Sequence, residues 1–478
     1  MALSGQDAIT KLVEHGVSQP LDLLVNNIFI RWPDATWGSP AHRDALAAAE
    51  QGLLAASEDR AYGISVSNLI ADESTAHQPL YRAARQLVVT RSNTFDDFLR
   101  ATHAHPPAQF ETLRLILSEY ASPSRDKRRP PTATTHAVLR VPGWRTLRHL
   151  SLVGVTVTPE LWADIAALES LTTLELSGCD LVEIPASVIM SFRTGASPLA
   201  RLRLWVCRAD ASFAGLVKQL RGLRELEVSR CSERSDSYRH YTHDADGTAV
   251  APALVEALRG LTALESVSLK GYPELAEGLA DALASLTGLR HLAVIRSDIG
   301  AESQRRLLEL DTLARGLETL DLTQTPVLDD RALTRRRWPA LEHLRLGECG
   351  LSEGFPDALA RAPFAAQLRS LELWAEKPRF SADGLVRMLN AAPLAQLESL
   401  ELAAAHLEDR DVLTAIATRL RGLRRLSTSL HCRASAAGLA AVLESPHLED
   451  LEIKTPWRST LYVKSALAPK LPMDLATT

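Results

Sequence analysis

The chain has 478 residues, of which 46% are hydrophobic, so it is long enough to bury a sizeable core and to form several domains. The net charge of -5 differs from the strongly positive charge typical of proteins that bind nucleic acids or anionic membranes. We therefore expect no nucleic acid as a partner. The N-terminus lacks the pattern of an export signal, and Asp22, Asn26 and Asn27 interrupt the longest early apolar run, so we expect no membrane span.

The cysteine content indicates a reducing compartment. The five cysteines form no even, closely spaced framework, and no C-x-x-C occurs, which argues against a disulfide scaffold and against a zinc knuckle. We therefore expect a cytoplasmic protein. The basic charge is nearly all Arg, and Ala and Leu are abundant, which indicates a GC-rich genome and a bacterial origin.

The first 120 residues show apolar residues at helical spacing. The clearest start has Ser39 as a candidate N-cap and Pro40 at the first helical position. This pattern predicts an all-α N-terminal domain over 1–120 that serves as a cap or an adaptor. The basic, Pro-, Ser- and Thr-rich segment that follows predicts a linker over 121–140. The expected helices cover 4–16, 39–61, 78–91, 94–104 and 107–120.

A nine-residue pattern then recurs along the chain. The stretch LTTLELSGC, residues 171–179, reads L-x-x-L-x-L-x-x-C, and its positions are numbered here 1 to 9 from the first leucine. Successive first leucines stand 24 to 29 residues apart, except for one interval of 41. Twelve copies begin at Leu147, Leu171, Leu199, Leu223, Leu264, Leu289, Leu317, Leu341, Leu368, Leu397, Leu423 and Leu448.

These copies, together with apolar helical runs such as AGLVKQLRG and GLVRMLNAAP between them, resemble the leucine-rich-repeat family across 141–457. The spacing and the full helices are similar to the ribonuclease-inhibitor-like and cysteine-containing subclasses. The resemblance implies an α/β fold, a solenoid of about twelve repeats with a curved parallel sheet inside and helices outside, preceded by the all-α N-terminal domain.

Cysteine occupies position 9 of four copies. In the family this position holds Asn or Cys, whose side chain points inward after the strand and caps backbone groups of neighbouring turns. The resemblance therefore implies structural rather than reactive thiols. These residues are Cys179, Cys207, Cys231 and Cys349, while Cys432 falls one place out of register.

Alternation along each strand sends positions 5 and 7 to the concave face of the sheet. Position 5 carries six acids and two arginines among the twelve copies, which predicts an acidic groove for a partner with a basic surface. The alternative is a solvated sheet face that carries charge without a partner. Position 7 contains two tryptophans, a residue type enriched at binding hot spots. The candidate partner-binding residues are Arg203, Glu227, Asp321, Arg345, Glu372 and Glu401 at position 5, and Trp205, Ile295 and Trp374 at position 7.

The long interval of 41 residues contains a segment, 230–252, that is rich in Ser, Asp, His and Tyr and predicts an inserted loop. The loop serves either as a spacer or as a recognition element, and the candidates for recognition are Tyr238, Arg239, His240 and Tyr241. Its histidines and aspartates lack a fixed spacing, so we expect no metal site. The segment 458–478 has lost the repeat pattern and predicts a C-terminal cap and tail.

The sequence signatures of phosphate-binding loops and of zinc-dependent hydrolases do not occur. The chain contains no GxxxxGK[ST], no GxGxxG after a strand and no HExxH, so we expect neither an enzyme nor a cofactor. The pattern favours a non-enzymatic scaffold that binds a protein through the concave face. Two alternatives stay open: an N-terminal effector or enzymatic domain of unrecognised type that the repeats target, and a structural subunit of a homo-oligomer.

Overall fold

A computed structural model describes the chain in segments that fall into two compact units, Met1–Leu220 and Arg221–Thr478, called here unit 1 and unit 2. The described residues are 63–65, 86–90, 110–116, 131–141, 144–181, 183–194, 198–231, 250–272, 275, 278–325, 330–375, 378–394, 396–403, 406, 409–428, 436–445, 450–454 and 460–464.

Unit 1 contains a parallel sheet and a layer of helices. Its main strands pair in chain order, and a second small sheet, β6 with β8, follows two of them. The strands are β1 (Gly63–Ser65), β2 (Gln86–Thr90), β3 (Thr112–Ile116), β4 (His149–Val153), β5 (Thr173–Ser177), β6 (Asp180–Leu181), β7 (Arg201–Trp205) and β8 (Arg208–Ala209). The helices are α6 (Pro131–Leu139), α7 (Pro159–Ala166), α8 (Ala186–Thr194) and α9 (Ala211–Gln219), with a 3₁₀ turn, η5 (Trp144–Thr146).

Unit 2 repeats the same plan over more copies. Its strands are β9 (Glu225–Ser229), β10 (Ser266–Lys270), β11 (His291–Ile295), β12 (Thr319–Asp321), β13 (His343–Arg345), β14 (Ser370–Leu373), β15 (Ser399–Leu402), β16 (Arg425–Thr428), β17 (Asp450–Lys454) and β18 (Thr460–Lys464). Its helices are α10 (Val250–Leu258), α11 (Leu279–Ala284), α12 (Ala301–Leu308), α13 (Asp311–Gly316), α14 (Asp330–Arg335), α15 (Phe355–Ala360), α16 (Ala382–Asn390), α18 (Arg410–Arg419) and α19 (Ala436–Leu443), with 3₁₀ turns η7 (Ala365–Gln367) and η8 (Ala392–Leu394). No helix in the described part of the chain has the length and hydropathy needed to cross a membrane.

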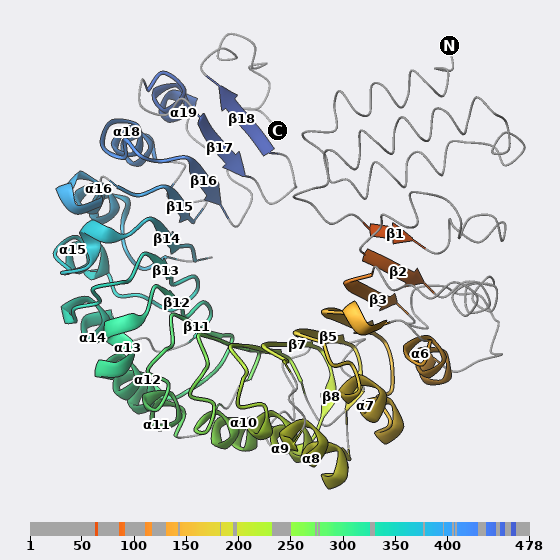
Figure 1. Cartoon of the computed structure of the whole chain (residues 1–478). Coiled ribbons are helices and arrows are strands. Elements are labelled where there is room, and N and C mark those ends of the chain that lie inside the picture. Colours follow the sequence, from red (N-terminus) through yellow and green to blue (C-terminus); the bar gives the residue numbers. More distant parts are fainter. Residues whose placement is uncertain are drawn as a thin grey trace, which may run out of the picture. The chain divides into compact units, whose positions relative to one another are not determined.

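The predicted solenoid is confirmed. Each of the twelve expected copies contributes a strand that begins two residues after its first leucine, and within each unit the strands lie on the inner side of the curve and the helices on the outer side (Figure 1). The apolar residues at positions 1, 4 and 6 fill the space between the two layers; Leu171, Leu174 and Leu176, for example, are at most 3% exposed. Each such leucine stabilises the fold by about 1.5–3 kcal/mol relative to an exposed one.

The expectation of an all-helical 1–120 is wrong for the described residues, because β1, β2 and β3 fall within it. These strands extend the parallel sheet of unit 1, with Leu113 opposite Leu150 and Leu115 opposite Leu152. Phe110, which is fully buried, takes the place of the first leucine in the copy that forms β3. A search for leucine at position 1 therefore missed this copy. The other expected helices of 1–120 lie outside the described residues.

The expected linker also contains an element. Helix α6 lies inside 121–140, with Thr135 and Val138 fully buried. Trp144, just after it, is 4% exposed and donates its indole N–H to the carbonyl of Val138 at 2.7 Å. Helix α6 and Trp144, just before the first predicted repeat, thus pack together within unit 1.

The expected inserted loop lies almost entirely outside the described residues, which resume with α10 at Val250; Cys432 lies outside them too. At the far end, β18 within 458–478 pairs antiparallel with β17, and the rest of that segment lies outside the described part. The pairing of β16 with β17 is displaced by two residues relative to the repeat numbering, with Arg425 opposite Glu452. Because the displacement is even, the two faces of the sheet are preserved.

In the eight copies that begin at Leu147 through Leu341, the residue at position 8 turns the chain out of the strand with a positive φ. In unit 2 this residue is Gly in one copy (Gly271) and a residue with a side chain in others, among them Gln324 and Glu348. Its N–H donates to the carbonyl of position 7 in the next repeat; for Glu348 and Trp374 the N···O distance is 2.8 Å. The left-handed turn therefore continues the hydrogen bonding between repeats beyond the end of the strand.

We expect Gly350→Ala to destabilise unit 2 by about 1 kcal/mol, because Gly350 has φ of +68° and an L side chain is disfavoured there. A Cβ at Gly350 would meet no atom within 4 Å. Any loss of stability in Gly350→Ala would therefore come from the backbone conformation and not from a steric clash. Gly260→Ala is the matched control: this glycine is also exposed with open space around it, but its φ is not positive. Thermal unfolding followed by circular dichroism should show a lower midpoint for Gly350→Ala only; equal midpoints would contradict the assigned turn.

Candidate functional site: the inner face of the sheet

The inner face is formed by positions 3, 5 and 7, which alternate with the buried leucines at 4 and 6. In β14, for example, Ser370 and Glu372 are half-buried while Leu371 and Leu373 are 1% exposed. Parallel pairing without offset places equal positions of successive repeats side by side, so each position forms a column across the strands.

Four charged residues of position 5 stand next to one another on β12 to β15, and we call Asp321, Arg345, Glu372 and Glu401 the central charge cluster. Arg345 lies between two acids: its guanidinium is 3.7 Å from Asp321 Oδ2 and 3.5 Å from Glu372 Oε2. Glu401, on the far side of Glu372, accepts a hydrogen bond from the hydroxyl of Ser427 at 2.9 Å. One cation therefore stands among three carboxylates.

Trp374 lies beside this cluster at position 7 of the same strand as Glu372. Its indole N–H donates to Glu372 Oε1 at 2.5 Å. The ring covers Gly347 on the neighbouring repeat, where an added Cβ would overlap the indole. The side chain is therefore half-buried on the inner face.

Burial raises the pKa of Glu372 to about 7, from an ordinary value of 4.5. The charge on Glu401 raises this pKa further, and that on Asp321 does so less, while the Trp374 N–H and the Arg345 guanidinium oppose the shift. The carboxyl group is 19% exposed as a side chain, so solvent screens these charges only partly. Near neutral pH, Glu372 is thus divided between its protonated and ionised forms.

Position 5 of unit 1 carries a contrasting arrangement. Glu175 accepts hydrogen bonds from cationic or potentially cationic groups on both neighbouring strands: His149 Nε2 at 3.3 Å and Arg203 at 3.2 Å. The hydrogen bond from His149 is the main cause that lowers the pKa of Glu175, and Arg203 adds to it against the cost of burial. The same residue type at the same position is therefore stabilised in its ionised form in unit 1 and in its protonated form in unit 2.

The remaining predicted residues are more dispersed. Trp205 and Ile295 occupy position 7, Glu227 occupies position 5, and all three are half-buried. The loop candidates Tyr238 to Tyr241 lie outside the described residues. The sequence analysis placed only positions 5 and 7 on the inner face and so missed His149. This residue occupies position 3, which shares that face by the same alternation. It also missed Gly347, whose lack of a side chain makes room for Trp374.

The four repeat cysteines are buried, each no more than 2% exposed. Three of the thiols donate across to a carbonyl of the preceding repeat: Cys179 to Leu152 at 3.4 Å, Cys207 to Leu176 at 3.3 Å and Cys349 to Leu322 at 2.9 Å. Burial raises the pKa of Cys179 and takes that of Cys349 to about 12, so neither carries an appreciable fraction of thiolate near neutral pH.

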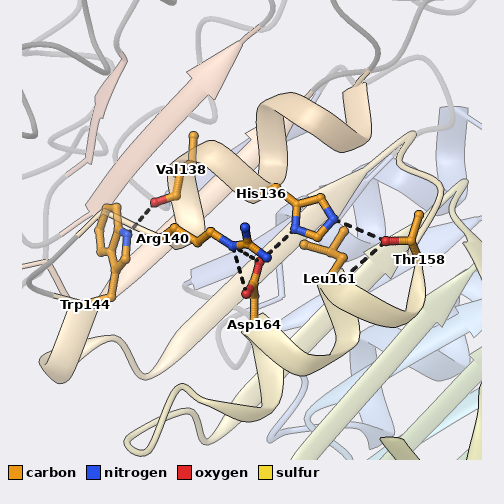
Figure 2. Close-up of polar contacts among 7 residues, drawn as sticks. All are labelled: His136, Val138, Arg140, Trp144, Thr158, Leu161 and Asp164. Atoms are coloured by element: carbon orange, nitrogen blue, oxygen red, sulfur yellow. Dashed lines mark hydrogen bonds and ion pairs between the residues drawn. The ribbon is translucent and has the colours of Figure 1, made fainter.

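A second polar cluster joins α6 to α7 in unit 1 (Figure 2). Asp164 accepts a hydrogen bond from His136 Nδ1 at 2.7 Å and two from the Nε of Arg140 at 3.1 and 3.2 Å. The other ring nitrogen of His136 lies 3.2 Å from the hydroxyl oxygen of Thr158. That oxygen also accepts the N–H of Leu161 at 3.3 Å and so caps the N-terminus of α7.

Asp164, His136 and Thr158 stand in the order of acid, base and hydroxyl that hydrolases use. Here the hydroxyl oxygen serves as the helix cap, and Arg140 shares the carboxylate. The chemistry of the contacts is that of a clasp between two helices. Among the residues that the structure describes, no group of three or more His, Cys, Asp or Glu side chains is arranged to hold a metal ion.

Comparison with known proteins adds little. No protein-family model matches the chain, and no curated protein does. Similar solved structures include a leucine-rich-repeat protein of Leptospira interrogans, at 14% identity and a TM-score of 0.41, covering 85% of this chain and 93% of that one. They also include the yeast complex of Rad7 and Elc1, at 14% identity and a TM-score of 0.42, covering 74% of this chain and 86% of that one. At similarities this low, we take neither fold nor function from them.

We expect Glu372→Gln to stabilise the protein at high pH. Because the folded pKa is above 4.5, the stability due to Glu372 is present in acid and is lost as the pH rises from about 4.5 to about 7. Gln resembles the protonated form of Glu. Above about pH 7, the free energy of unfolding of the variant should therefore exceed that of the parent by on the order of 1–2 kcal/mol, a value reduced for solvent screening. The difference should vanish in acid.

Glu175→Gln is the matched control with the opposite sign. The folded pKa of Glu175 is lowered, so its stability is present above 4.5 and is lost as the pH falls through the folded value. This variant should melt at a lower temperature than the parent at neutral pH, and the difference should shrink in acid. Melting midpoints measured across the pH range for both variants would contradict the assignment if the two changed in the same direction.

We expect Asp164→Asn to loosen the attachment of α6. The amide keeps the size of the carboxylate but loses its charge-assisted bonds to His136 and Arg140, a loss of about 1–2 kcal/mol. Thermal unfolding should show a lower midpoint, with Glu169→Gln, an exposed acid in the turn after α7, as the control. An unchanged midpoint for Asp164→Asn would mean that the clasp contributes no net stability.

Proposed function

We propose that the protein is a non-enzymatic recognition scaffold that binds a protein partner through the inner face of its sheet. The observation that carries this proposal is the central charge cluster of unit 2. Its three carboxylates have one guanidinium among them, and Arg345 is itself 52% exposed, so solvent and partners can reach the cluster.

The excess of acid defines the chemistry of the partner. With all groups ionised, Asp321, Glu372 and Glu401 outnumber Arg345 by two charges, and Glu372 and Glu401 stand directly opposite on adjacent strands. Like charges in this arrangement destabilise the sheet. A basic side chain of the partner would relieve that repulsion, so we infer that the partner presents Lys or Arg to this face.

Trp374 supplies the apolar part of the same surface. Half-buried over Gly347, the ring is held in one orientation before any partner arrives, and a preordered tryptophan loses little conformational freedom on binding. Its position beside Glu372 allows one cationic side chain to contact both a carboxylate and the indole face.

The buried thiols support a reducing compartment. Four cysteines are buried in the repeats as thiols, a state that a reducing environment maintains, and we therefore propose that the protein functions in the cytoplasm. The thiol-to-carbonyl contacts between repeats support the cysteine-containing subclass of the ribonuclease-inhibitor-like repeats, of bacterial origin.

The test is capture of partners by the full chain compared with two double variants of equal charge change. Glu372→Gln/Glu401→Gln removes two acids from the inner face. Glu302→Gln/Glu309→Gln removes two acids from the region of α12 on the outer side, where they pair with exposed Arg305. Partners would be identified by mass spectrometry after capture from a lysate, and their affinity measured with the purified proteins.

We expect the inner-face double variant to bind its partner at least about tenfold more weakly, which corresponds to about 1.4 kcal/mol, and the outer variant to bind normally. The bound protein should carry a Lys- or Arg-rich surface, and its affinity should fall with added salt. Equal binding by all three chains would contradict recognition through the central charge cluster.

A further inference from the structure

We propose that Glu372 is a proton-dependent switch on the inner face of unit 2: it is protonated when the face is empty in mild acid and ionised when a cationic group of the partner occupies the face. The effect on binding rests on the proposed function. The proton site itself does not, because it belongs to the free chain.

The arrangement of neighbours makes Glu372 the residue that takes the proton. On one side, Arg345 contacts Asp321 as well as Glu372, so its single charge is divided between two acids. On the other side, Glu401 stands directly opposite Glu372 and adds a like charge. Two carboxylates at paired positions of adjacent strands repel each other when both are ionised, so the charge on Glu401 favours the protonated form of Glu372.

Charged or titratable groups lie near Glu372 on the strands to both sides of it. Strand β12 contributes Asp321, β13 contributes Arg345 and, two residues earlier on the same face, His343, and β15 contributes Glu401. On its own strand, Trp374 donates an N–H to Oε1. That N–H favours the ionised form but leaves Oε2 facing Arg345 at 3.5 Å, outside hydrogen-bonding distance. The balance among these groups sets the switch near neutral pH, where burial has moved the pKa of Glu372.

Linkage gives the direction of the regulation. The ionised cluster carries one more negative charge than the protonated one, so it attracts a basic partner more strongly, and binding of that partner expels the proton. Affinity should therefore rise with pH up to about 7 and level off above it. A scaffold built in this way would release its partner on mild acidification, without any change of fold.

The experiment follows the indole N–H of Trp374 as a reporter of the Glu372 carboxyl group. The full chain, labelled with ¹⁵N at its eight tryptophans, gives one indole signal for each, and Trp374→Phe identifies the signal of interest. We expect this signal to move between about pH 5 and about pH 9 with a midpoint near 7. The signal of Trp338, whose indole N–H donates to the backbone carbonyl of Leu333, serves as the internal control.

Two variants separate the causes. Glu372→Gln should abolish the movement of the Trp374 signal. Glu401→Gln should lower the midpoint of that movement by about one pH unit, because it removes the negative charge that disfavours ionisation of Glu372. The inference is overturned if the Trp374 signal stays fixed over this range, or if it moves with the same midpoint in Glu372→Gln. These measurements need no partner, so their failure is distinct from a failure of the capture experiment. With a partner in hand, affinity that falls below pH 7 in the parent and not in Glu372→Gln supports the switch, and a flat profile in the parent overturns its role in binding.

Discussion

The parallel pairing of successive strands without offset is the constraint on which the rest of the molecule depends. It holds for every described pair within each unit up to β16, and it aligns equal positions of the repeats into columns. Columns 1, 4 and 6 become a continuous apolar core, and column 8 supplies the left-handed turn whose N–H reaches the next repeat. A side chain at column 5 has its chemistry decided by the residues at column 5 of the two adjoining copies.

Glu175 and Glu372 illustrate this dependence. Both occupy column 5, both are half-buried, and they differ in what adjoins them: His149 and Arg203 in one case, Arg345 and Glu401 in the other. The first has a hydrogen-bond donor on each side, His149 and Arg203, and is stabilised as a carboxylate; the second has a cation on one side and an acid on the other. In a solenoid, therefore, the order of charged residues along the repeats sets the pKa of each carboxyl group in a column. The sequence of one repeat alone does not predict that pKa.

Much of this was accessible from the sequence. The spacing of leucines located all twelve strands from β4 to β17, other than the short β6 and β8, and alternation placed Asp321, Arg345, Glu372 and Glu401 on one face. What the sequence did not reveal has physical causes. Phe110 at position 1 concealed the copy that forms β3, because the motif is defined by burial and not by leucine itself. The half-burial of Trp374 depends on Gly347, which lies 27 residues away along the chain, and only the register brings the two together.

The reactivity of the buried thiols reports on local opening of the repeats. Cys179 and Cys207 lie in unit 1, and Cys231 and Cys349 lie in unit 2, all shielded from reagents while the repeats stay stacked. Alkylation of each sulfur then proceeds only through transient separation of the repeat that covers it, so its rate measures the free energy of that local opening. Four natural probes, two in each unit, thus make it possible to map how cooperatively the repeats of each unit hold together, without engineered cysteines.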